Sequence, residues 1–275
     1  MKLDLSAAWD GAVRMLSRNK DTLLVLGGVF FFLPYLAFSL FVPEADTAAA
    51  MEGSNPDYDA AFAAVQGIYA EYWWALLLLA VVQSIGLISV LAVLGDPARP
   101  TVGAAIERGV KFLLPQIGAQ LLTALAIFAL VMIAVVAGVA LGAGAAVLIA
   151  LLVIPIVIYL VIKFSLAAPS IAIDRIANPL GALAQSWRLT KGNSLRLFAF
   201  YALLLVALIV VSTVLSLIVG LVLALLGEGA ALIGGGIVMS VLNTIFALVA
   251  YAVLASVHRQ LSGGGASVPR TARDE

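Results

Sequence analysis

The residue range 112–162 contains no Asp, Glu, Lys or Arg, and this run constrains the fold more than any other feature of the chain. An α-helix rises 1.5 Å per residue and the hydrocarbon core of a bilayer is about 30 Å thick, so the run is too long for a single crossing. The glycine-rich patch 138–144 offers a turn near its middle. The run therefore predicts two spans, 114–139 and 145–164, with a kink at Pro155 in the second.

The composition agrees with a chain whose natural solvent is lipid. Hydrophobic residues make up 64% of it and charged residues 11%, against about 45–50% and about 25% in soluble domains. The absence of cysteine excludes disulfides, iron–sulfur clusters and thiolate zinc sites. Because the formal net charge is zero, the total charge favours no class of partner, and we expect no nucleic-acid binding.

Four further apolar stretches are long enough to cross a membrane, at 22–42, 73–94, 197–226 and 230–257. A cleaved signal peptide is the alternative reading of the first stretch, because small residues at 45–50 would suit a cleavage site. The stretch is about 21 residues long, however, whereas such apolar regions usually have about 7–15. The chain therefore predicts six spans.

Three shorter segments, 5–18, 102–113 and 179–191, have the pattern of amphipathic helices. In the last of them Asn178 is a suitable N-cap, Pro179 suits the first helical position, and Gly192 is a natural stop. Four of its apolar residues share one face: Leu180, Leu183, Ala184 and Trp187. We expect each segment to lie at the membrane surface with its apolar side toward lipid.

The charges predict the orientation. On the six-span arrangement all fifteen Lys and Arg fall on one side, and the positive-inside rule makes that side cytoplasmic, together with both termini. The opposite side carries an acidic loop, a short helix capped by Asp57, and Trp73 and Trp74 at the interface. We expect the location to be the bacterial inner membrane.

The predicted fold class is an all-α membrane protein. It has six transmembrane helices arranged as three hairpins, each preceded by a cytoplasmic amphipathic interfacial helix. The single polytopic membrane domain covers 1–257, and a disordered cytoplasmic tail covers 258–275. Aligning the three units places Asn19, Pro115 and Asn193 at equivalent breaks before a span.

The segment between the fourth and fifth spans carries a recognisable motif. Its residues are Pro169, Asp174, Asn178-Pro179-Leu180, Ala182-Leu183, Ser186-Trp187 and Leu189-Thr190-Lys191-Gly192. This run resembles the membrane domain associated with bacterial glycerophosphodiester phosphodiesterases and the related YciC-like inner-membrane proteins of unknown function. The resemblance implies that a proline ends a span, an acidic residue follows, and the helix after it leads into the next span.

In the phosphodiesterases of this family a catalytic domain follows the membrane domain, whereas this chain ends at Glu275. We therefore expect the phosphodiesterase activity not to carry over, and the resemblance transfers no catalytic residues. We expect no cofactor and no metal, since the acids around 44–59 lack the spacing of a calcium loop and read as a solvated linker. His258, the single histidine, reads as a polar residue at the cytoplasmic end of the last span.

Two sets of residues are candidates for function. The basic and aromatic residues of the amphipathic segments are candidates for binding anionic lipid headgroups or a membrane-protein partner: Trp9, Arg14, Arg18, Arg108, Lys111, Trp187, Arg188 and Lys191. Three amides inside the spans, Gln83, Gln120 and Asn243, are candidates for a polar path, although hydrogen bonding between helices also accounts for them.

These features predict a membrane accessory or scaffold module that has no catalytic site and contacts lipid or a partner through its cytoplasmic helices. The alternative is a transporter of a small or lipid-related solute through a polar path between the spans. An enzyme acting on a phospholipid-derived substrate ranks third.

Overall fold

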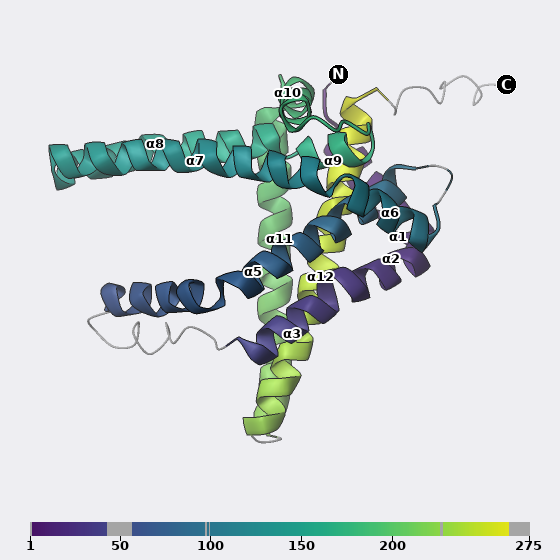
Figure 1. The fold of residues 1–275 in the computed structure, drawn as a ribbon, viewed down its shortest axis with the longest axis horizontal. Coiled ribbons are helices and arrows are strands. Elements are labelled where there is room, and N and C mark those ends of the chain that lie inside the picture. Colours follow the sequence, from purple (N-terminus) through teal and green to yellow (C-terminus); the bar gives the residue numbers. More distant parts are fainter. Residues whose placement is uncertain (1, 43–56, 97, 99, 226–227, 264–275) are drawn as a thin grey trace.

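The structure is a computed structural model that describes residues 2–42, 57–96, 98, 100–225 and 228–263 (Figure 1). Most of the acidic loop and the C-terminal tail from 264 lie outside the described residues. The elements are α1 (Leu5–Arg18), α2 (Lys20–Gly27), the π-helix η1 (Gly28–Phe32), α3 (Leu33–Phe41), α5 (Tyr58–Gly95), α6 (Val102–Lys111), α7 (Leu113–Leu141), α8 (Ala143–Phe164), α9 (Ala167–Ala172), α10 (Pro179–Thr190), α11 (Ser194–Ala224) and α12 (Glu228–Leu261).

The described residues form helices and contain no strand. Six stretches among them are long and apolar enough to cross a membrane: Lys20–Phe41, Tyr58–Gly95, Leu113–Leu141, Gly144–Ala172, Ser194–Leu223 and Ile233–Leu261. The predicted all-helical class and the number of candidate spans are thereby confirmed.

The first candidate span contains a widened turn, and a proline accounts for it. Pro34 has no N–H, so the ordinary hydrogen bond back to residue 30 cannot form. The N–H of Leu33 instead donates to the carbonyl of Gly28, five residues earlier, which is π-helical pairing.

The predicted second span, 73–94, is the C-terminal part of a longer helix, α5. The Asp57 side chain caps the start of α5 by accepting from the N–H of Ala60 at 2.9 Å. Tyr72 interrupts the helix with φ −108° and ψ 19°. This kink lies one residue before the predicted span and separates it from the predicted short helix that precedes it.

Each of the three short helices is followed by another helix, and the residue just before that next helix has a distorted backbone conformation. The φ/ψ values are −120°/17° at Asn19, −101°/12° at Phe112 and −121°/3° at Asn193. Between α10 and α11 this residue is preceded by Lys191 (φ −63°, ψ 127°) and Gly192 (φ 80°). The fourth and seventh residues after each junction are buried, as the pairs Leu23 and Leu26, Gln116 and Ala119, and Leu197 and Phe200. These shared positions make the three units similar in backbone and burial, although their side chains differ.

The middle junction differs from the expected one. It falls at Phe112, three residues before Pro115. Pro115 is instead the third residue of α7, where a backbone N–H has no partner within the helix, so proline is tolerated there.

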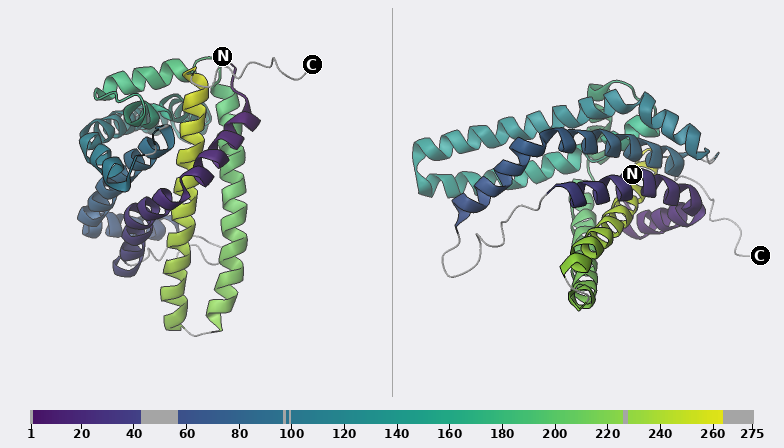
Figure 2. Two further views of the ribbon diagram at one scale, coloured as in Figure 1. Left: turned by 90° about the vertical axis from the view of Figure 1, so that its right-hand side faces the viewer. Right: turned by 60° about the horizontal axis from the view of Figure 1, so that its bottom comes forward.

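The buried core gathers at one end of the molecule, which we call the hub: α1, α6, α9 and α10 with the adjoining ends of α5 and α12. Its fully buried side chains include Ala8, Leu91, Ile171, Ala182 and Val257. From the hub α7 and α8 extend side by side in one direction, and α11 and α12 extend side by side in another (Figures 1 and 2). The described Lys and Arg residues lie in the hub or in the turns of the long helices that adjoin it.

Close backbone approach holds two of the short helices in the hub. A Cβ at Gly11 of α1 would clash with the Ser256 side chain of α12, and a Cβ at Gly109 of α6 would clash with Ser89 and the Ile85 carbonyl of α5. Glycine at these positions therefore lets the helices pack against each other, as small residues do in membrane helix pairs.

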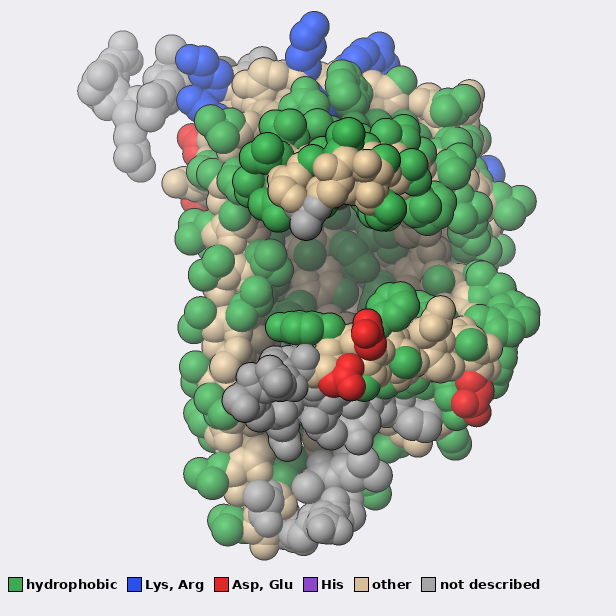
Figure 3. Space-filling model, turned by 90° about the vertical axis from the view of Figure 1, so that its left-hand side faces the viewer, with side chains coloured by type: hydrophobic (Ala, Val, Ile, Leu, Met, Phe, Trp, Pro, Cys, Tyr) green, Lys and Arg blue, Asp and Glu red, His purple; other side chains and the backbone are tan. Residues whose placement is uncertain are grey.

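The long helices expose apolar side chains over most of their length. The spans in α7, α8 and α11 have almost no residue buried within the chain. Figure 3 shows a hydrophobic face with a hollow in its middle, Lys and Arg side chains at its upper end and Asp and Glu side chains below the hollow. Because these exposed surfaces are large and apolar, they are suited to contact with lipid.

Candidate functional site in the hub

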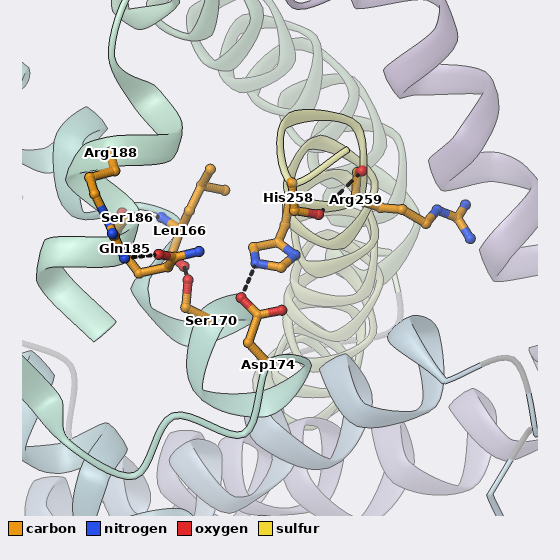
Figure 4. A network of polar contacts seen from close by, with 9 residues as sticks. Leu166, Ser170, Asp174, Gln185, Ser186, Arg188, His258 and Arg259 are labelled. Atoms are coloured by element: carbon orange, nitrogen blue, oxygen red, sulfur yellow. Dashed lines mark hydrogen bonds and ion pairs between the residues drawn. The ribbon is translucent and has the colours of Figure 1, made fainter. Parts of the chain in front are cut away.

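A side-chain hydrogen bond joins the segment after α9 to the end of α12. Nε2 of His258 lies 3.0 Å from Oδ2 of Asp174 (Figure 4). His258 is only 1% exposed, whereas the Asp174 side chain is 32% exposed. The next residue, Arg175, has φ 58°, a left-handed conformation that is uncommon outside glycine. The backbone therefore turns sharply where Asp174 reaches the histidine.

The buried Nδ1 of His258 has no hydrogen-bond partner in the described part of the chain. A neutral ring that donates from Nε2 to the carboxylate carries only a lone pair at Nδ1. A buried lone pair without a partner costs less than a buried N–H in the same position would, so this tautomer fits the site. The sequence predicted a polar residue at the end of the last span, and the structure adds that His258 is buried within the protein and bonded to Asp174.

Ser186 fixes α10 to the break between α8 and α9. Its Oγ accepts from the N–H of Leu166 at 3.0 Å and donates to the carbonyl of Lys163 at 2.6 Å. Ser170 Oγ donates to the Leu166 carbonyl at 2.8 Å, so the same break is held from a second side (Figure 4). The serine of the motif therefore serves a buried structural contact that positions α10.

Lys163 lies among aromatic rings at the end of α8. Its Nζ is 5.3 Å from the ring centroid of Tyr159 and 5.1 Å from that of Trp187, and the residue is 2% exposed. Trp187 also packs edge-on to Tyr159 at 5.9 Å. Cation–π contacts that are this desolvated contribute up to about 2 kcal/mol. The motif tryptophan thus helps to hold the charge of Lys163 inside the hub.

Some apolar residues of α10 are buried against the hub, and others are exposed on the surface of the protein. The side packed in the hub consists of Ala182, Leu183, Ser186 and Thr190. Leu180 and Trp187, both on the predicted apolar face, remain 63% and 38% exposed. The buried strip is therefore rotated from the predicted face, and two large apolar side chains stay available at the surface.

The candidate residues of α1 fall in two places. Trp9 is exposed and borders a groove of about 480 Å³ against Phe200 and Leu203 of α11. Arg14 and Arg18 line a separate cavity of about 170 Å³.

The candidate residues of α6 border another cavity. Arg108 and Lys111 line a space of about 260 Å³ together with Arg175. Arg108 also pairs with Asp96 just after α5, at 3.2 Å. The pKa of the Asp96 carboxyl is held below its usual value first because it accepts from the backbone N–H of Ala98 at 3.0 Å, and then because of the hydrogen bond and charge of Arg108.

Arg188 and Lys191 lie on the exposed side of α10 and its end. Arg188 donates to Gln185 on its own helix. Neither residue borders the cavities of α1 and α6 just described. The structure therefore brings the basic candidates together in pairs, by helix, and not into one patch.

Among the described residues, no hydrogen bond links the three candidate amides Gln83, Gln120 and Asn243 to one another. Gln120 accepts from Ser84 Oγ at 3.3 Å, next in sequence to Gln83. One turn earlier, Gln116 is buried and its Oε1 has no partner in the described chain. These groups form a short polar strip between α5 and α7, whereas Asn243 lies on α12.

Sequence reasoning missed the contact between Asp174 and His258 and the place of Arg259 in the hub. Asp174 and His258 are 84 residues apart, and no local periodicity connects them. Arg259 completes the cavity of Arg14 and Arg18, and its only signal in the sequence was a basic residue at the end of a span. Among the described residues, no group of three or more His, Cys, Asp or Glu is arranged to hold a metal ion.

Six candidate spans around a packed hub define the class, a multi-pass membrane protein. Within it, residues 141–262 match the family model of the membrane domain of glycerophosphoryl diester phosphodiesterase, which confirms the resemblance drawn from the motif. The matched range includes both Asp174 and His258. No curated protein and no solved structure matches the chain.

Proposed function

We propose that the chain is an accessory or scaffold module of the bacterial inner membrane that contacts anionic lipid or a membrane-protein partner through α1, α6 and α10. In this proposal the six spans form three pairs, each preceded by a cytoplasmic amphipathic helix. Both termini are cytoplasmic, and the chain carries no catalytic site of its own.

One observation carries the proposal. Each short helix buries a strip of small residues in the hub and leaves large apolar side chains exposed beside basic ones. The exposed apolar residues are Trp9 and Val13 on α1, Val110 on α6, and Leu180 and Trp187 on α10. A helix that is held by protein on one side and keeps such a strip free is suited to a membrane interface.

Tryptophan fluorescence tests this placement. The chain has four tryptophans, so replacing Trp9, Trp73 and Trp74 by phenylalanine leaves Trp187 as the only emitter. In phosphatidylcholine vesicles containing phosphatidylglycerol, lipids brominated along the acyl chain should quench Trp187 strongly, because α10 meets the interface there.

The matched control retains Trp73 alone, which is exposed on the second candidate span. Its emission should be quenched by the same lipids. If the aqueous quencher acrylamide quenches Trp187 and brominated lipids do not, α10 lies away from the bilayer and the proposal is wrong.

A transporter is the second candidate, and the polar strip of Gln116, Gln120 and Ser84 supports it. Because the chain has no cysteine, a Ser84→Cys variant carries one thiol at this strip. Reaction of that thiol with a membrane-impermeant methanethiosulfonate reagent would indicate a water-filled path. A thiol that reacts only after denaturation would exclude the path at this position.

A further inference from the structure

The cavity at the end of α1 brings three arginines from two distant parts of the chain together. Its lining consists of Arg14, Met15, Arg18, Asn19, Leu94, Gly95, Asp96 and Arg259, and its volume is about 170 Å³. Arg14 and Arg18 come from α1, whereas Arg259 comes from the last turn of α12. Figure 4 shows that Arg259 points away from the neighbouring His258–Asp174 pair.

Helix packing fixes this convergence. Gly11 packs directly on Ser256, and Arg14 and Arg18 follow Gly11 by three and seven residues, which places them on the same side of α1. Arg259 follows Ser256 by three residues on α12. The close contact of the two helices therefore directs all three side chains to one place.

The charges of this cavity are not balanced by the described protein. Three guanidinium groups and the Asp96 carboxylate give the lining a net charge of +2. Asp96 is already paired with Arg108 outside the lining, and Arg14, Arg18 and Arg259 have no ion pair among the described residues.

The ends of helices account for only part of this arrangement. Arg18 and Arg259 lie in the last turns of α1 and α12, where the helix dipole favours a cation. That effect explains each charge by itself. It does not explain why three like charges converge, since their mutual repulsion opposes the packing.

We infer that this cavity binds the phosphate group of an anionic ligand, with a preference for a dianionic phosphate monoester over a monoanionic diester. Guanidinium groups donate in pairs to phosphate oxygens, and a lining of net charge +2 matches two negative charges. Met15 and Leu94 supply an apolar border for the part of the ligand that carries the phosphate. If the phosphate belongs to a lipid, this inference rests on the proposed function, in which the chain contacts anionic lipid.

Binding to the purified full-length chain tests the inference in two arms. Native mass spectrometry measures the binding of phosphatidic acid and of phosphatidylglycerol to the detergent-solubilised protein, and calorimetry measures the binding of inorganic phosphate. We expect phosphatidic acid to bind about tenfold more tightly than phosphatidylglycerol, because it offers one more charge to the arginines. Binding of phosphatidic acid alone identifies a lipid headgroup, and comparable binding of inorganic phosphate identifies a soluble phosphate. Absence of binding in both arms overturns the inference.

Single substitutions locate the site. Arg18→Gln and Arg259→Gln should each weaken binding about tenfold or more, since each removes charge-assisted hydrogen bonds. Arg259→Lys keeps the charge but loses the planar fork, so it should weaken binding less and shows whether the fold tolerates a change there. The matched control is Lys2→Gln, an exposed basic residue outside the cavity and outside the candidate lipid-binding set, which should leave binding within about twofold.

Equal loss in Lys2→Gln and Arg259→Gln would indicate binding to surface charge in general and overturn the inference. If brominated lipids quench Trp187 but the arginine variants bind like the unaltered protein, the placement of α10 stands and the phosphate site alone fails.

Discussion

Single residues of the hub act across long distances in sequence, and the Asp174–His258 pair shows this most directly. The histidine is buried and its hydrogen bond to the carboxylate links α12 to the segment that follows α9. A buried ring that loses its acceptor is left with an unsatisfied N–H. The pair therefore fixes the end of the last span against the centre of the hub.

Replacing Asp174 by asparagine should reduce the free energy of unfolding by about 1–3 kcal/mol, because the amide is a weaker acceptor for the buried N–H than the carboxylate. Denaturant unfolding in mild detergent, followed by circular dichroism, measures the change. Asp10→Asn is the control, since Asp10 is exposed and has no ion pair among the described residues. Equal stability of the two variants would contradict the role of the pair.

Asp96 makes the stability of the fold depend on pH, and the direction of this dependence follows from its lowered pKa. Its pKa is lowered in the folded protein, first by the Ala98 N–H and then by Arg108. A lowered carboxyl pKa stabilises the fold above the pKa of the unfolded chain, about 3.9, and that contribution is lost as the pH falls through the folded value. The difference in stability between the protein and Asp96→Asn should be about 0.2–1 kcal/mol at pH 7. It should begin to shrink as the pH falls toward the unfolded value of about 3.9 and should be lost as the pH falls through the lowered folded value. A difference that persists in acid would show that the charge of Asp96 is not its cause.

Among the helices, α1 and α6 depend on glycine for their place in the hub. On α6, Gly109 faces Ser89 and the backbone carbonyl of Ile85, whereas Gly103 has no atom within 4 Å of an added Cβ. One helix thus offers a packed glycine and a free one for comparison.

Gly109→Ala should cost about 1–3 kcal/mol of unfolding free energy, because a backbone atom has to move away from the new methyl group. Gly103→Ala should be neutral or stabilise the protein by up to about 1 kcal/mol through helix propensity. Thermal unfolding of the two variants side by side measures both effects. A Gly109→Ala protein that is as stable as Gly103→Ala would mean that α6 and α5 do not approach as closely as described.

The sequence predicted the helices better than their contacts. Long uncharged runs predicted an all-helical chain with six candidate spans, and aligning the three units placed Asn19 and Asn193 at junctions. The same alignment placed the middle junction at Pro115, three residues after its position at Phe112. Which face of α10 packs in the hub was not predictable, because Ala182, Ser186 and Thr190 are small or polar and periodicity weighs large apolar residues more heavily. The Asp174–His258 pair and the position of Arg259 depend on tertiary packing alone.

The whole molecule separates its charges along its length. The described Lys and Arg lie in or beside the hub, and Asp57, Asp59 and Glu71 lie at the far end of α5. A membrane protein with this distribution is expected to keep its basic end in the cytoplasm.

Cysteine labelling tests this orientation on a chain that has no native cysteine. In intact bacterial spheroplasts, a membrane-impermeant maleimide should label Asp59→Cys. It should label Lys191→Cys only after the membrane is permeabilised, because that residue follows α10 at the basic end. The reverse pattern would place the hub outside the cell.

The three junctions have a mechanical consequence for the molecule. At 1.5 Å per residue the 29 residues of α7 reach about 43 Å from Phe112, and the far half of that helix packs beside α8. A change of about 10° at this one residue would therefore displace the tip of α7 by about 7 Å, given that length. A change in bilayer thickness that tilts the long helices would therefore change the backbone conformation at the junctions with the hub, at Asn19, Phe112 and Asn193.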